Sequence, residues 1–306
     1  MNVAFAGTPD FAATILRGLV SSRHEVGLVI SRPDTRMGRG RNAQPTPVAE
    51  LARSLGLPLS QPTRISEASR EISDCDALVV AAYGQILRPD TLYAARLGAW
   101  NVHASLLPKY RGAAPIERAI MNGEHETGVT IMRMDEGLDT GPIALQRAVE
   151  IPPDMTGGEL STMLAQVGAK AVVEVLGLIE ADDVNLTEQV NRDATYASKL
   201  VDEDLTIRWD RGAREVHDLI RALSPHIGAR TYHPEIKGPL KLWRASVFEV
   251  GNRSLNAGHI YEENDRILVG CGTGVLELLE LQLPGAKRLL TPDFLRGNTL
   301  SGAFQV

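Results

Sequence analysis

The chain has few cysteines and no spacing that suggests a metal site. Among its 306 residues only Cys75 and Cys271 occur, far apart and both inside apolar segments. We therefore expect two buried free thiols in a reducing compartment rather than a disulfide. No C-x-x-C pair is present, and the seven histidines never fall at the spacing of a zincin helix. The sequence thus argues against structural or catalytic zinc.

The sequence also lacks the marks of export and of membrane insertion. Its opening, MNVAFAG, is too short and too uncharged for a signal peptide. No apolar run approaches the roughly 18 residues that a membrane span needs, so no span is expected. A chain of this length with 43% hydrophobic residues is expected to fold into two soluble domains. We expect a cytoplasmic monomer, because no coiled-coil pattern or large apolar stripe is visible.

Positive charge gathers locally although the chain as a whole is acidic, with a net charge of −6. The first basic patch contains Arg32, Arg36, Arg39 and Arg41 beside Asp34, and the second contains Arg230, Lys237, Lys241 and Arg244 beside Glu235. The local field, rather than net charge, decides whether a phosphate backbone is attracted. Each patch is therefore either a nucleic-acid contact or an ordinary solvated loop.

Residues 1–182 alternate between strand and helix patterns. Continuous apolar segments, expected as strands, occupy 3–6, 26–30, 77–82, 97–102, 127–134 and 143–149. Strands that are apolar on both faces are typical of a buried parallel sheet. A first helix is expected after Thr8, which can cap it, with Pro9 in the first helical position. A long helix should run from a capping box at Thr156 and Glu159 to about residue 181. The pattern predicts an α/β, Rossmann-like domain with a parallel-rich sheet.

The chain changes character after this domain. Residues 183–204 are polar and aperiodic, and we interpret them as a linker. In the remainder, 205–306, an apolar helix face covers 213–223. Short strands are expected at 231–232, 240–247, 258–261, 267–270 and 275–281. This spacing predicts a small OB-like β-barrel, a fold that commonly binds oligonucleotides.

Polar side chains gather where the strand at 97–102 ends. Asn101, His103 and Ser105 lie within five residues, and Asp139 follows a second apolar segment. In an open α/β sheet, polar groups at strand ends build the active site. Asn101 could donate to a developing oxyanion, His103 could donate or carry a proton, and Asp139 could orient the imidazole. Ser105 is not expected to be a nucleophile, because no G-x-S-x-G elbow surrounds it. Spacing alone leaves acyl transfer and proton transfer both open.

Longer motifs around these residues resemble the methionyl-tRNA formyltransferase family over essentially the whole chain. They are AGTPDF at 6–11, AYG at 82–84, NVH at 101–103, SLLP at 105–108, YRGAAPI at 110–116, ETGVT at 126–130 and LDTG at 138–141. That family transfers a formyl group from 10-formyltetrahydrofolate to the amino group of initiator Met-tRNA. The resemblance implies a formyltransferase of translation initiation that uses Asn101, His103 and Asp139 in catalysis and needs no metal.

The resemblance also implies which residues bind the two substrates. Tetrahydrofolate would contact Ser105, Leu106, Leu107 and Pro108, largely through the main chain, and its pterin would lie against Ile86 and Leu87. The segment from 36 to 41 resembles a mobile loop of the family that enters the tRNA acceptor end, with Arg36, Arg39 and Arg41 as its contacts. The β-domain would add contacts to the tRNA backbone through Lys237, Lys241 and Arg244.

Three other functions remain open alongside this one. A formyltetrahydrofolate hydrolase would use the same three polar residues with water as the acceptor. A sugar-nucleotide formyltransferase would share those residues but should lack the arginine loop. The third is an RNA-binding module whose α/β half has lost catalysis. Dinucleotide binding at Gly38 and Gly40 is disfavoured, because no ribose-binding acid follows at the expected distance.

Overall fold

The computed structural model describes residues 1–36, 43–249 and 255–305. Within these ranges the chain forms two compact units. The first consists of Met1–Pro115, Glu126–Glu150 and Ser161–Ser198, and the second of Ile116–His125, Ile151–Leu160 and Lys199–Val306. The division predicted at residues 182 and 205 is simpler than this interleaved arrangement, and it stays a prediction about the domains.

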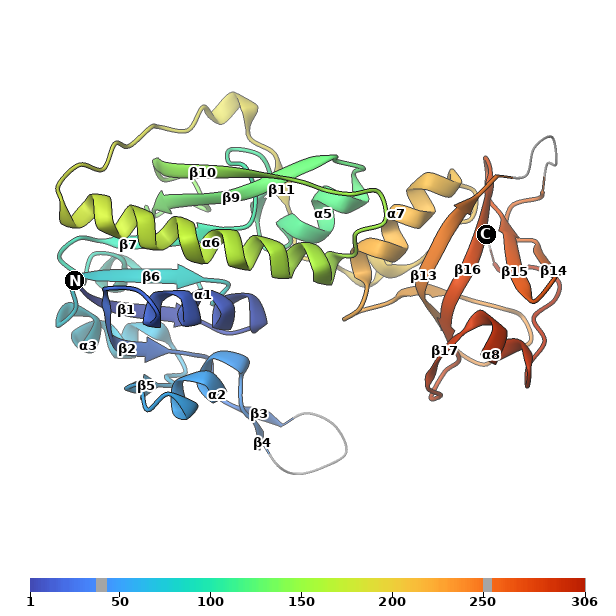
Figure 1. Cartoon of the computed structure of the whole chain (residues 1–306), viewed down its shortest axis with the longest axis horizontal. Helices are drawn as coiled ribbons and strands as arrows, with labels where there is room; N and C mark the ends of the chain where they lie inside the picture. Colours follow the sequence, from blue (N-terminus) through green and yellow to red (C-terminus); the bar gives the residue numbers. More distant parts are fainter. Residues whose placement is uncertain (37–42, 250–254, 306) are drawn as a thin grey trace. The chain divides into compact units, whose positions relative to one another are not determined.

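A seven-stranded sheet forms the centre of the first unit over the described residues (Figure 1). Its strands are β1 (Asn2–Gly7), β2 (Glu25–Ile30), β5 (Leu59–Ser60), β6 (Ala77–Ala81), β7 (Ala99–His103), β9 (Glu126–Arg133) and β10 (Ile143–Glu150), in the order β10-β9-β7-β6-β1-β2-β5. The strands from β7 to β5 in this order are parallel, whereas β9 and β10 are antiparallel to their neighbours. The Rossmann-like, parallel-rich prediction is confirmed.

Helices and short strands fill the connections of this unit. The helices are α1 (Asp10–Val20), α2 (Pro47–Ser54), α3 (Ser69–Ser73), α4 (Pro89–Leu92) and α6 (Gly157–Glu180), with the 3-10 turns η1 (Ile65–Ala68) and η2 (Asn191–Asp193). The short strands β3 (Thr35–Arg36) and β4 (Ala43–Gln44) pair with each other, as do β8 (Arg111–Gly112) and β11 (Tyr196–Ala197). The β8–β11 pair matters for the site described below.

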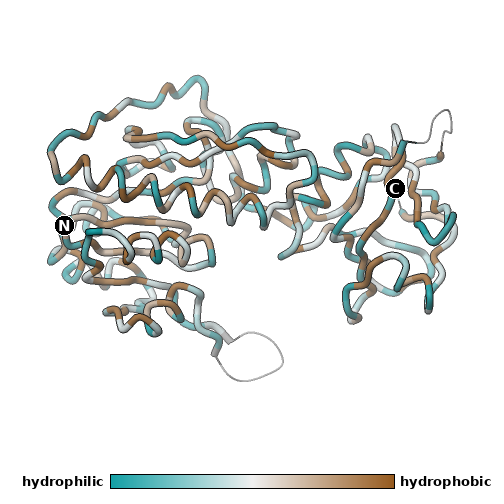
Figure 2. The backbone as a smooth tube through the Cα atoms, in the orientation of Figure 1, coloured by the Kyte–Doolittle hydropathy of each residue, from teal (hydrophilic) through white to brown (hydrophobic). Residues whose placement is uncertain are grey.

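Burial on both faces explains why the apolar segments became parallel strands. Every residue of β6 is buried, and so are all but the first of β1. The brown stretches in Figure 2 mark these central strands. A continuous apolar run suits a strand that is covered on both sides, whereas an alternating run would leave polar side chains in the core.

The first helix begins later than the sequence predicts. Its N-cap is Pro9 and its first residue is Asp10, one residue later than predicted, so the predicted cap at Thr8 was wrong. The Thr8 hydroxyl is used elsewhere, because Oγ1 donates to the carbonyl oxygen of Tyr83 at 3.2 Å. The first turn therefore has no side-chain cap, because Pro9 occupies the N-cap position.

The capping box of the long helix α6 is confirmed. The main-chain N–H and the hydroxyl of Thr156 donate to Glu159 Oε2 at 2.8 and 2.7 Å, and the N–H of Glu159 donates back to Thr156 Oγ1 at 3.3 Å. The helix also has the predicted length, and by length and composition alone Gly157–Glu180 could cross a membrane. The core helix of a soluble protein meets the same criterion, and Leu164, Val172 and Leu176 are fully buried.

The segment interpreted as a linker carries more structure than its composition suggests. Thr187 forms a bridge with Ile143, and β11 pairs in parallel with β8, with Tyr196 opposite Arg111. The main-chain N–H of Arg111 donates to the carbonyl oxygen of Thr195 at 2.9 Å. Polar composition gives no sign of this pairing, because these residues are held by hydrogen bonds rather than by an apolar face.

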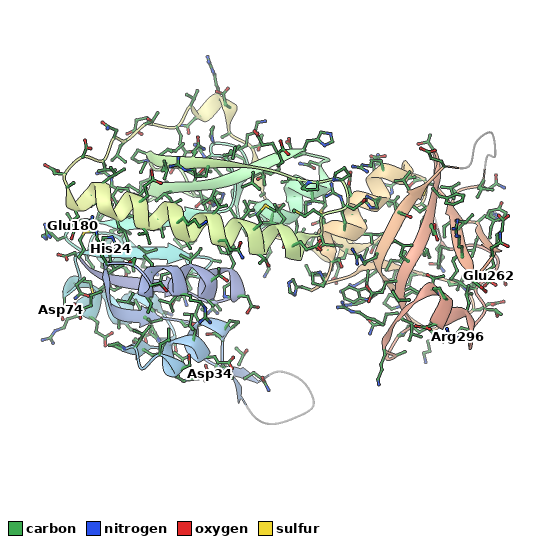
Figure 3. All side chains as sticks on the ribbon, in the orientation of Figure 1. His24, Asp34, Asp74, Glu180, Glu262 and Arg296 are labelled. Atoms are coloured by element: carbon green, nitrogen blue, oxygen red, sulfur yellow. The ribbon has the colours of Figure 1, made fainter. Side chains whose placement is uncertain are left out.

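A charged cluster forms where β2 begins. The Met1 amine and Arg23 Nη2 each lie 3.0 Å from a carboxylate oxygen of Glu180 at the end of α6. His24, labelled beside Glu180 in Figure 3, is only 4% exposed. Burial is the largest cause that lowers the pKa of His24 below its usual value. His24 is therefore a buried group whose charged form the fold disfavours.

The second unit is built on an antiparallel sheet. Its strands are β12 (Ala229–Thr231), β13 (Leu240–Phe248), β14 (Ile260–Glu263), β15 (Arg266–Gly270), β16 (Val275–Gln282) and β17 (Arg288–Leu290), and its helices are α5 (Pro115–Met121), α7 (Ala213–Leu223) and α8 (Thr291–Leu295), with η3 (Asp202–Leu205). The order is β12-β13-β16-β15-β14, and β17 pairs with β16. The antiparallel β-domain and the helix at 213–223 are confirmed. Closure into a barrel would require the edge strands β12 and β14 to pair, and among the described residues they do not. The OB-like barrel therefore stays a prediction.

Candidate active site

The two polar residues of β7 lie where its parallel pairing ends. Asn101 is opposite Val80 of β6, and His103 is opposite Thr130 of the antiparallel strand β9. Residues two apart on a strand point to the same face, so Asn101 and His103 share one side of the sheet. His103 is 5% exposed, whereas Asn101 is half-buried. The carboxyl end of β7 thus presents an amide and an imidazole on the same face.

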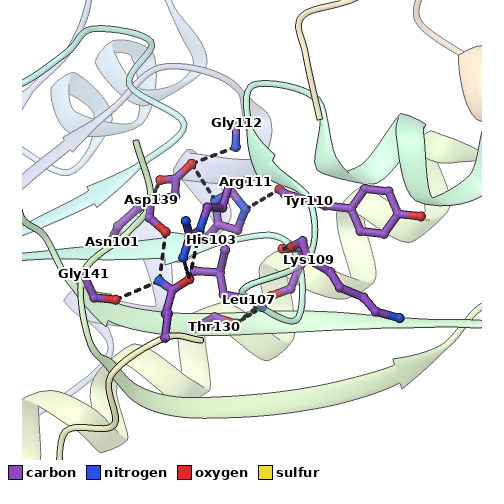
Figure 4. Close-up of polar contacts among 12 residues, drawn as sticks. Asn101, His103, Leu107, Lys109, Tyr110, Arg111, Gly112, Thr130, Asp139 and Gly141 are labelled. Carbon is purple, nitrogen blue, oxygen red and sulfur yellow. Dashed lines mark hydrogen bonds and ion pairs between the residues drawn. The ribbon is translucent and has the colours of Figure 1, made fainter. Parts of the chain in front are cut away.

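Asp139 joins them from the loop between β9 and β10 (Figure 4). Its Oδ1 accepts a hydrogen bond from Asn101 Nδ2 at 3.2 Å, and its Oδ2 lies 3.7 Å from His103 Nδ1. The main-chain N–H of Gly112 also donates to Oδ2, at 2.9 Å. The carboxylate side chain is 14% exposed, so it remains open to solvent or substrate. The structure therefore brings the three predicted residues together, and their catalytic role stays a prediction.

The main chain fixes which nitrogen of His103 carries a hydrogen. Nε2 lies 2.9 Å from the carbonyl oxygen of Tyr110, which can only accept. Nε2 must therefore be protonated. Nδ1 faces Asp139 and is the nitrogen that can exchange a proton. Tyr110 presents this carbonyl with φ at 60°, in the left-handed region that a tyrosine seldom adopts. Such backbone strain is concentrated at functional sites.

The predicted folate loop, Ser105–Pro108, is held by side chains of the neighbouring strands. Thr130 Oγ1 donates to the Ser105 carbonyl at 2.7 Å and accepts from the Leu107 N–H at 3.1 Å. Gln146 Nε2 donates to the Leu107 carbonyl at 2.8 Å. The side chains of Ser105 and Leu107 are buried, while Leu106 and Pro108 are half-buried. The Ser105 hydroxyl donates to the Lys109 carbonyl at 2.6 Å, which agrees with its exclusion as a nucleophile.

The two residues predicted to meet the pterin lie in different surroundings. Ile86 is 86% exposed, whereas Leu87 is 7% exposed and packs in the core cluster that also contains Tyr83 and Leu92. Tyr83 is 2% exposed, and burial raises the pKa of its hydroxyl. Ile86 is therefore available to a ligand, whereas Leu87 is part of the core. Periodicity could not separate these neighbours, because both are simply apolar.

Sequence reasoning missed two polar groups that surround Asp139. Gln189 contacts the main chain of the Asp139 loop, and the buried Arg111 contacts Gln189 in turn. Arg111 was noticed only as part of a longer motif, and Gln189 lies in the segment interpreted as a linker. No local sequence pattern distinguishes a glutamine of an active site from the other residues of a polar segment. The pairing of β8 with β11 is what brings these two residues together.

The structure describes some of the residues predicted to contact tRNA and leaves others outside the described ranges. Arg39 and Arg41 lie outside the described residues, and only the backbone of Arg36, in β3, is described. Lys237 and Arg244 are exposed. Lys241 Nζ donates to the Ile227 carbonyl at 2.6 Å and lies 5.3 Å from the Trp243 ring centroid. Burial, followed by the nearby arginines 230 and 288, lowers the pKa of Lys241. Lys241 is thus already engaged in the fold, and all six roles stay predictions.

No three His, Cys, Asp or Glu side chains of the described residues come together in a way that could hold a metal ion. Cys75 and Cys271 are both free and buried, as expected, and burial raises the pKa of Cys271 to about 12. A thiol with so high a pKa is a poor nucleophile at neutral pH. The polar groups around Asp139 are therefore the chemically promising cluster of the first unit.

Two family models together match most of the chain. The family model described as "Formyl transferase" matches residues 1–176, and that described as "Formyl transferase, C-terminal domain" matches residues 199–299. A methionyl-tRNA formyltransferase of Rubrobacter xylanophilus is 65% identical over 305 residues, which cover 100% of both chains. The chain belongs to the methionyl-tRNA formyltransferase family. Another member, from Pelotomaculum thermopropionicum, is 45% identical and covers 98% of this chain and 96% of its own.

Solved structures show the same fold at lower identity. An N-formyltransferase of Helicobacter canadensis, in complex with folinic acid and dTDP-3-aminofucose, has a TM-score of 0.68 at 18% identity and covers 94% of this chain and 100% of its own. HypX of Aquifex aeolicus, in complex with tetrahydrofolic acid, has a TM-score of 0.69 at 16% identity, covering 96% of this chain and 47% of its own. Membership of the methionyl-tRNA formyltransferase family makes the chain an enzyme that transfers formyl groups.

Proposed function

We propose that the chain transfers the formyl group of 10-formyltetrahydrofolate to the α-amino group of initiator Met-tRNA, with Asn101, His103 and Asp139 as catalytic residues. One observation supports these roles above all: the Asp139 carboxylate lies 3.2 Å from Asn101 Nδ2 and 3.7 Å from His103 Nδ1. Relatives named methionyl-tRNA formyltransferase, at 65% and 45% identity over nearly the full length, support the acceptor.

The reaction sets two demands on the site. The amine nitrogen forms a bond to the formyl carbon, and the bond from that carbon to the folate nitrogen breaks. The formyl oxygen gains negative charge on the way, and one proton must leave the amine while one reaches the departing nitrogen. The site therefore needs a hydrogen-bond donor for the oxygen and a group that moves a single proton.

Asn101 can supply the donor. An amide carries two N–H hydrogens, and the contact with Asp139 Oδ1 uses one of them. The second is left for the developing oxyanion, and the contact with Asp139 fixes its direction. Removing one such donor typically costs about 10² to 10³ in kcat. Asn101 thus serves the oxygen without changing its own charge.

His103 and Asp139 together can handle the proton. Because Nε2 of His103 is bound to the Tyr110 carbonyl, a proton can be exchanged only at Nδ1. The Asp139 carboxylate, 3.7 Å from Nδ1, stabilises an imidazolium that forms there. The N–H of Gly112 holds the carboxylate oxygen in place. This division of roles needs no covalent intermediate with the protein.

The residues around the site suit a reduced folate. Leu106 and Pro108 are half-buried and thus partly accessible, and Ile86 is 86% exposed. An exposed isoleucine can give a flat heteroaromatic ring an apolar surface, and a loop fixed by hydrogen bonds can give it fixed polar partners. We propose that the donor binds to these residues, and that the buried Leu87 contributes through the core rather than by direct contact.

The tRNA is proposed to contact Arg36, Arg39 and Arg41 and the exposed Lys237 and Arg244, with a smaller part for Lys241. Each contact between a cation and a phosphate makes affinity fall with salt, with a slope of about −0.7 to −0.9 per contact. The arginines can also stack on unpaired bases of the acceptor end. Cytoplasm and monomer remain the expected compartment and assembly.

One experiment tests the proposal against its alternatives. The enzyme is incubated with 10-formyltetrahydrofolate and with Met-tRNA, with water alone, or with an amino-sugar nucleotide, and release of tetrahydrofolate is followed. Fast release is expected only with Met-tRNA. Equal release with water alone would identify a hydrolase, and preference for the sugar nucleotide would identify a sugar formyltransferase.

A further inference from the structure

Asp139 has a main-chain conformation that needs support. Its φ is 52°, in the left-handed region, where a residue other than glycine is held only by its surroundings. The support comes from Gln189, whose Nε2 donates to the carbonyl oxygens of Asp139 and Gly141, each at 2.8 Å. Gly141 is also packed tightly, since a Cβ there would lie 1.9 Å from the Arg133 carbonyl oxygen. The loop that carries Asp139 is thus held on both sides.

The orientation of Gln189 is itself fixed by Arg111. Arg111 Nε and Nη2 donate to Gln189 Oε1 at 3.0 and 2.8 Å, and Nη2 also donates to Asn191 Oδ1 at 3.0 Å. Arg111 is 2% exposed, so its guanidinium is shielded from water. A flipped amide would place Oε1 against two carbonyl oxygens and Nε2 against a cation. Only one orientation of Gln189 therefore satisfies all four hydrogen bonds.

The same short strand reaches the other end of Asp139. Gly112, which follows Arg111 in β8, donates its N–H to Asp139 Oδ2 at 2.9 Å. Asp139 is consequently held at its carbonyl by Gln189 and at its carboxylate by Gly112. Both contacts depend on where β8 lies. Displacements of about 1 Å at a reacting group can cost about 10² in rate, so this arrangement bears directly on catalysis.

We propose that Gln189, oriented by Arg111, is a positioning residue that sets the Asp139 carboxylate for formyl transfer. This inference rests on the proposed catalytic role of Asp139. Gln189 acts through the main chain of the Asp139 loop and needs no contact with either substrate. The expected consequence of disturbing Gln189 is a loss of kcat while the KM values for Met-tRNA and for 10-formyltetrahydrofolate stay nearly constant.

Two near-isosteric variants separate positioning from simple structural support. Gln189→Glu keeps an acceptor for Arg111 but turns an oxygen toward the two carbonyls. Gln189→Met removes the acceptor of a buried guanidinium, yet it places no charge against the carbonyls. We expect Gln189→Glu to have the lower kcat, reduced about 10- to 100-fold with both KM values within about twofold of wild type. We expect Gln189→Met to have the lower melting temperature.

A matched control measures the effect of lost stability alone. Val175→Ala creates a small cavity under α6, where Val175 is fully buried. Its melting temperature should fall while its kcat stays at the wild-type value. If kcat follows melting temperature across Gln189→Glu, Gln189→Met and Val175→Ala, Gln189 is a structural residue and the inference is overturned.

A double-mutant cycle with Asp139→Asn decides whether Gln189 acts through Asp139. In the Asp139→Asn background, Gln189→Glu should lower kcat by less than about threefold, since the carboxylate it positions is already gone. An undiminished further loss would overturn the inference and leave the proposed role of Asp139 intact. A wild-type kcat for Asp139→Asn alone would instead overturn that proposed role, and this inference with it.

Discussion

Thr130 Oγ1 lies 2.7 Å from the carbonyl oxygen of Ser105, so one strand hydroxyl holds the start of the predicted folate loop. The same oxygen accepts from the Leu107 N–H and from Gln146 Nε2, at 3.1 and 3.0 Å. Thr130 is fully buried, and water cannot replace these partners without a rearrangement of the loop. One hydroxyl group of β9 thus holds two main-chain groups of the loop.

Replacing that hydroxyl should weaken donor binding. Thr130→Val keeps the shape of the side chain but leaves the Ser105 carbonyl and the Leu107 N–H without their partner, at a cost of about 1–3 kcal/mol in unfolding free energy. We expect KM for 10-formyltetrahydrofolate to rise several-fold, with a smaller change in KM for Met-tRNA. Steady-state kinetics and urea denaturation measure both effects. Thr130→Ser retains the hydroxyl and should stay close to wild type, and an equal rise in the serine variant would contradict the prediction.

The catalytic assignment makes a prediction about kcat. His103→Ala and Asp139→Ala should each lower kcat by about 10² or more, because each removes a group that moves or stabilises the transferred proton. Binding of Met-tRNA, measured by filter retention, should change little. A variant that binds folate poorly but keeps its turnover would show that the residue binds substrate rather than taking part in catalysis.

The arginine segment predicts a defect that is confined to tRNA. Arg39→Ala should raise KM for Met-tRNA, or lower turnover, while the affinity for folate is unchanged. The affinity for Met-tRNA should also fall less steeply with salt concentration. The slope should decrease by close to the value for one phosphate contact. The control is Arg96→Ala, since Arg96 is an exposed arginine that pairs with Asp76 at 2.9 Å, next to the amino end of β6. Equal effects of the two variants would remove Arg39 from the recognition surface.

His24 predicts how stability depends on pH. Burial, together with the Met1 amine and Arg23, lowers its folded-state pKa below the usual 6.5, and Glu180 opposes this shift. The unfolded chain therefore binds a proton at a higher pH than the folded chain does. The contribution of neutral His24 to the free energy of unfolding is therefore fully present above about pH 6.5. This contribution is lost as the pH falls below that value.

The measurement is urea denaturation of wild type and of His24→Gln between about pH 7 and pH 5. The free energy of unfolding should fall more steeply in wild type, by at most about 1.4 kcal/mol per pH unit for one proton. His259→Gln changes an exposed histidine and should keep the wild-type slope. Identical slopes for His24→Gln and wild type would show that His24 is not linked to folding.

Much of the first unit could be predicted because burial on both faces leaves a clear mark in the sequence. The strand that carries Asn101 and His103 was expected from a continuous apolar run, and two-residue spacing placed both on one face. Asp139 could be chosen because it follows a second apolar run. These inferences need only local periodicity and the rule that active sites lie at strand ends.

The other features of the fold and of the site depend on contacts between residues that are distant in the sequence, which no local pattern indicates. Gln189 reaches Asp139 across 50 positions, through hydrogen bonds rather than through an apolar face. Leu87 and Ile86 are neighbours of similar hydrophobicity, and only the fold decides that one is buried and the other exposed. The Thr8 hydroxyl, predicted to cap the first helix, instead donates to Tyr83, a partner 75 positions away.

The pairing of β8 with β11 also limits how the protein can be shortened. A fragment that stops at residue 182 would contain Asn101, His103 and Asp139 but would lack the strand at Tyr196–Ala197 and the amide of Gln189. The match to the formyl transferase family model likewise ends at residue 176. A stand-alone catalytic fragment should therefore extend at least to Ser198, where the first unit ends. Any design that inserts a tag or joins new termini should leave this late segment intact.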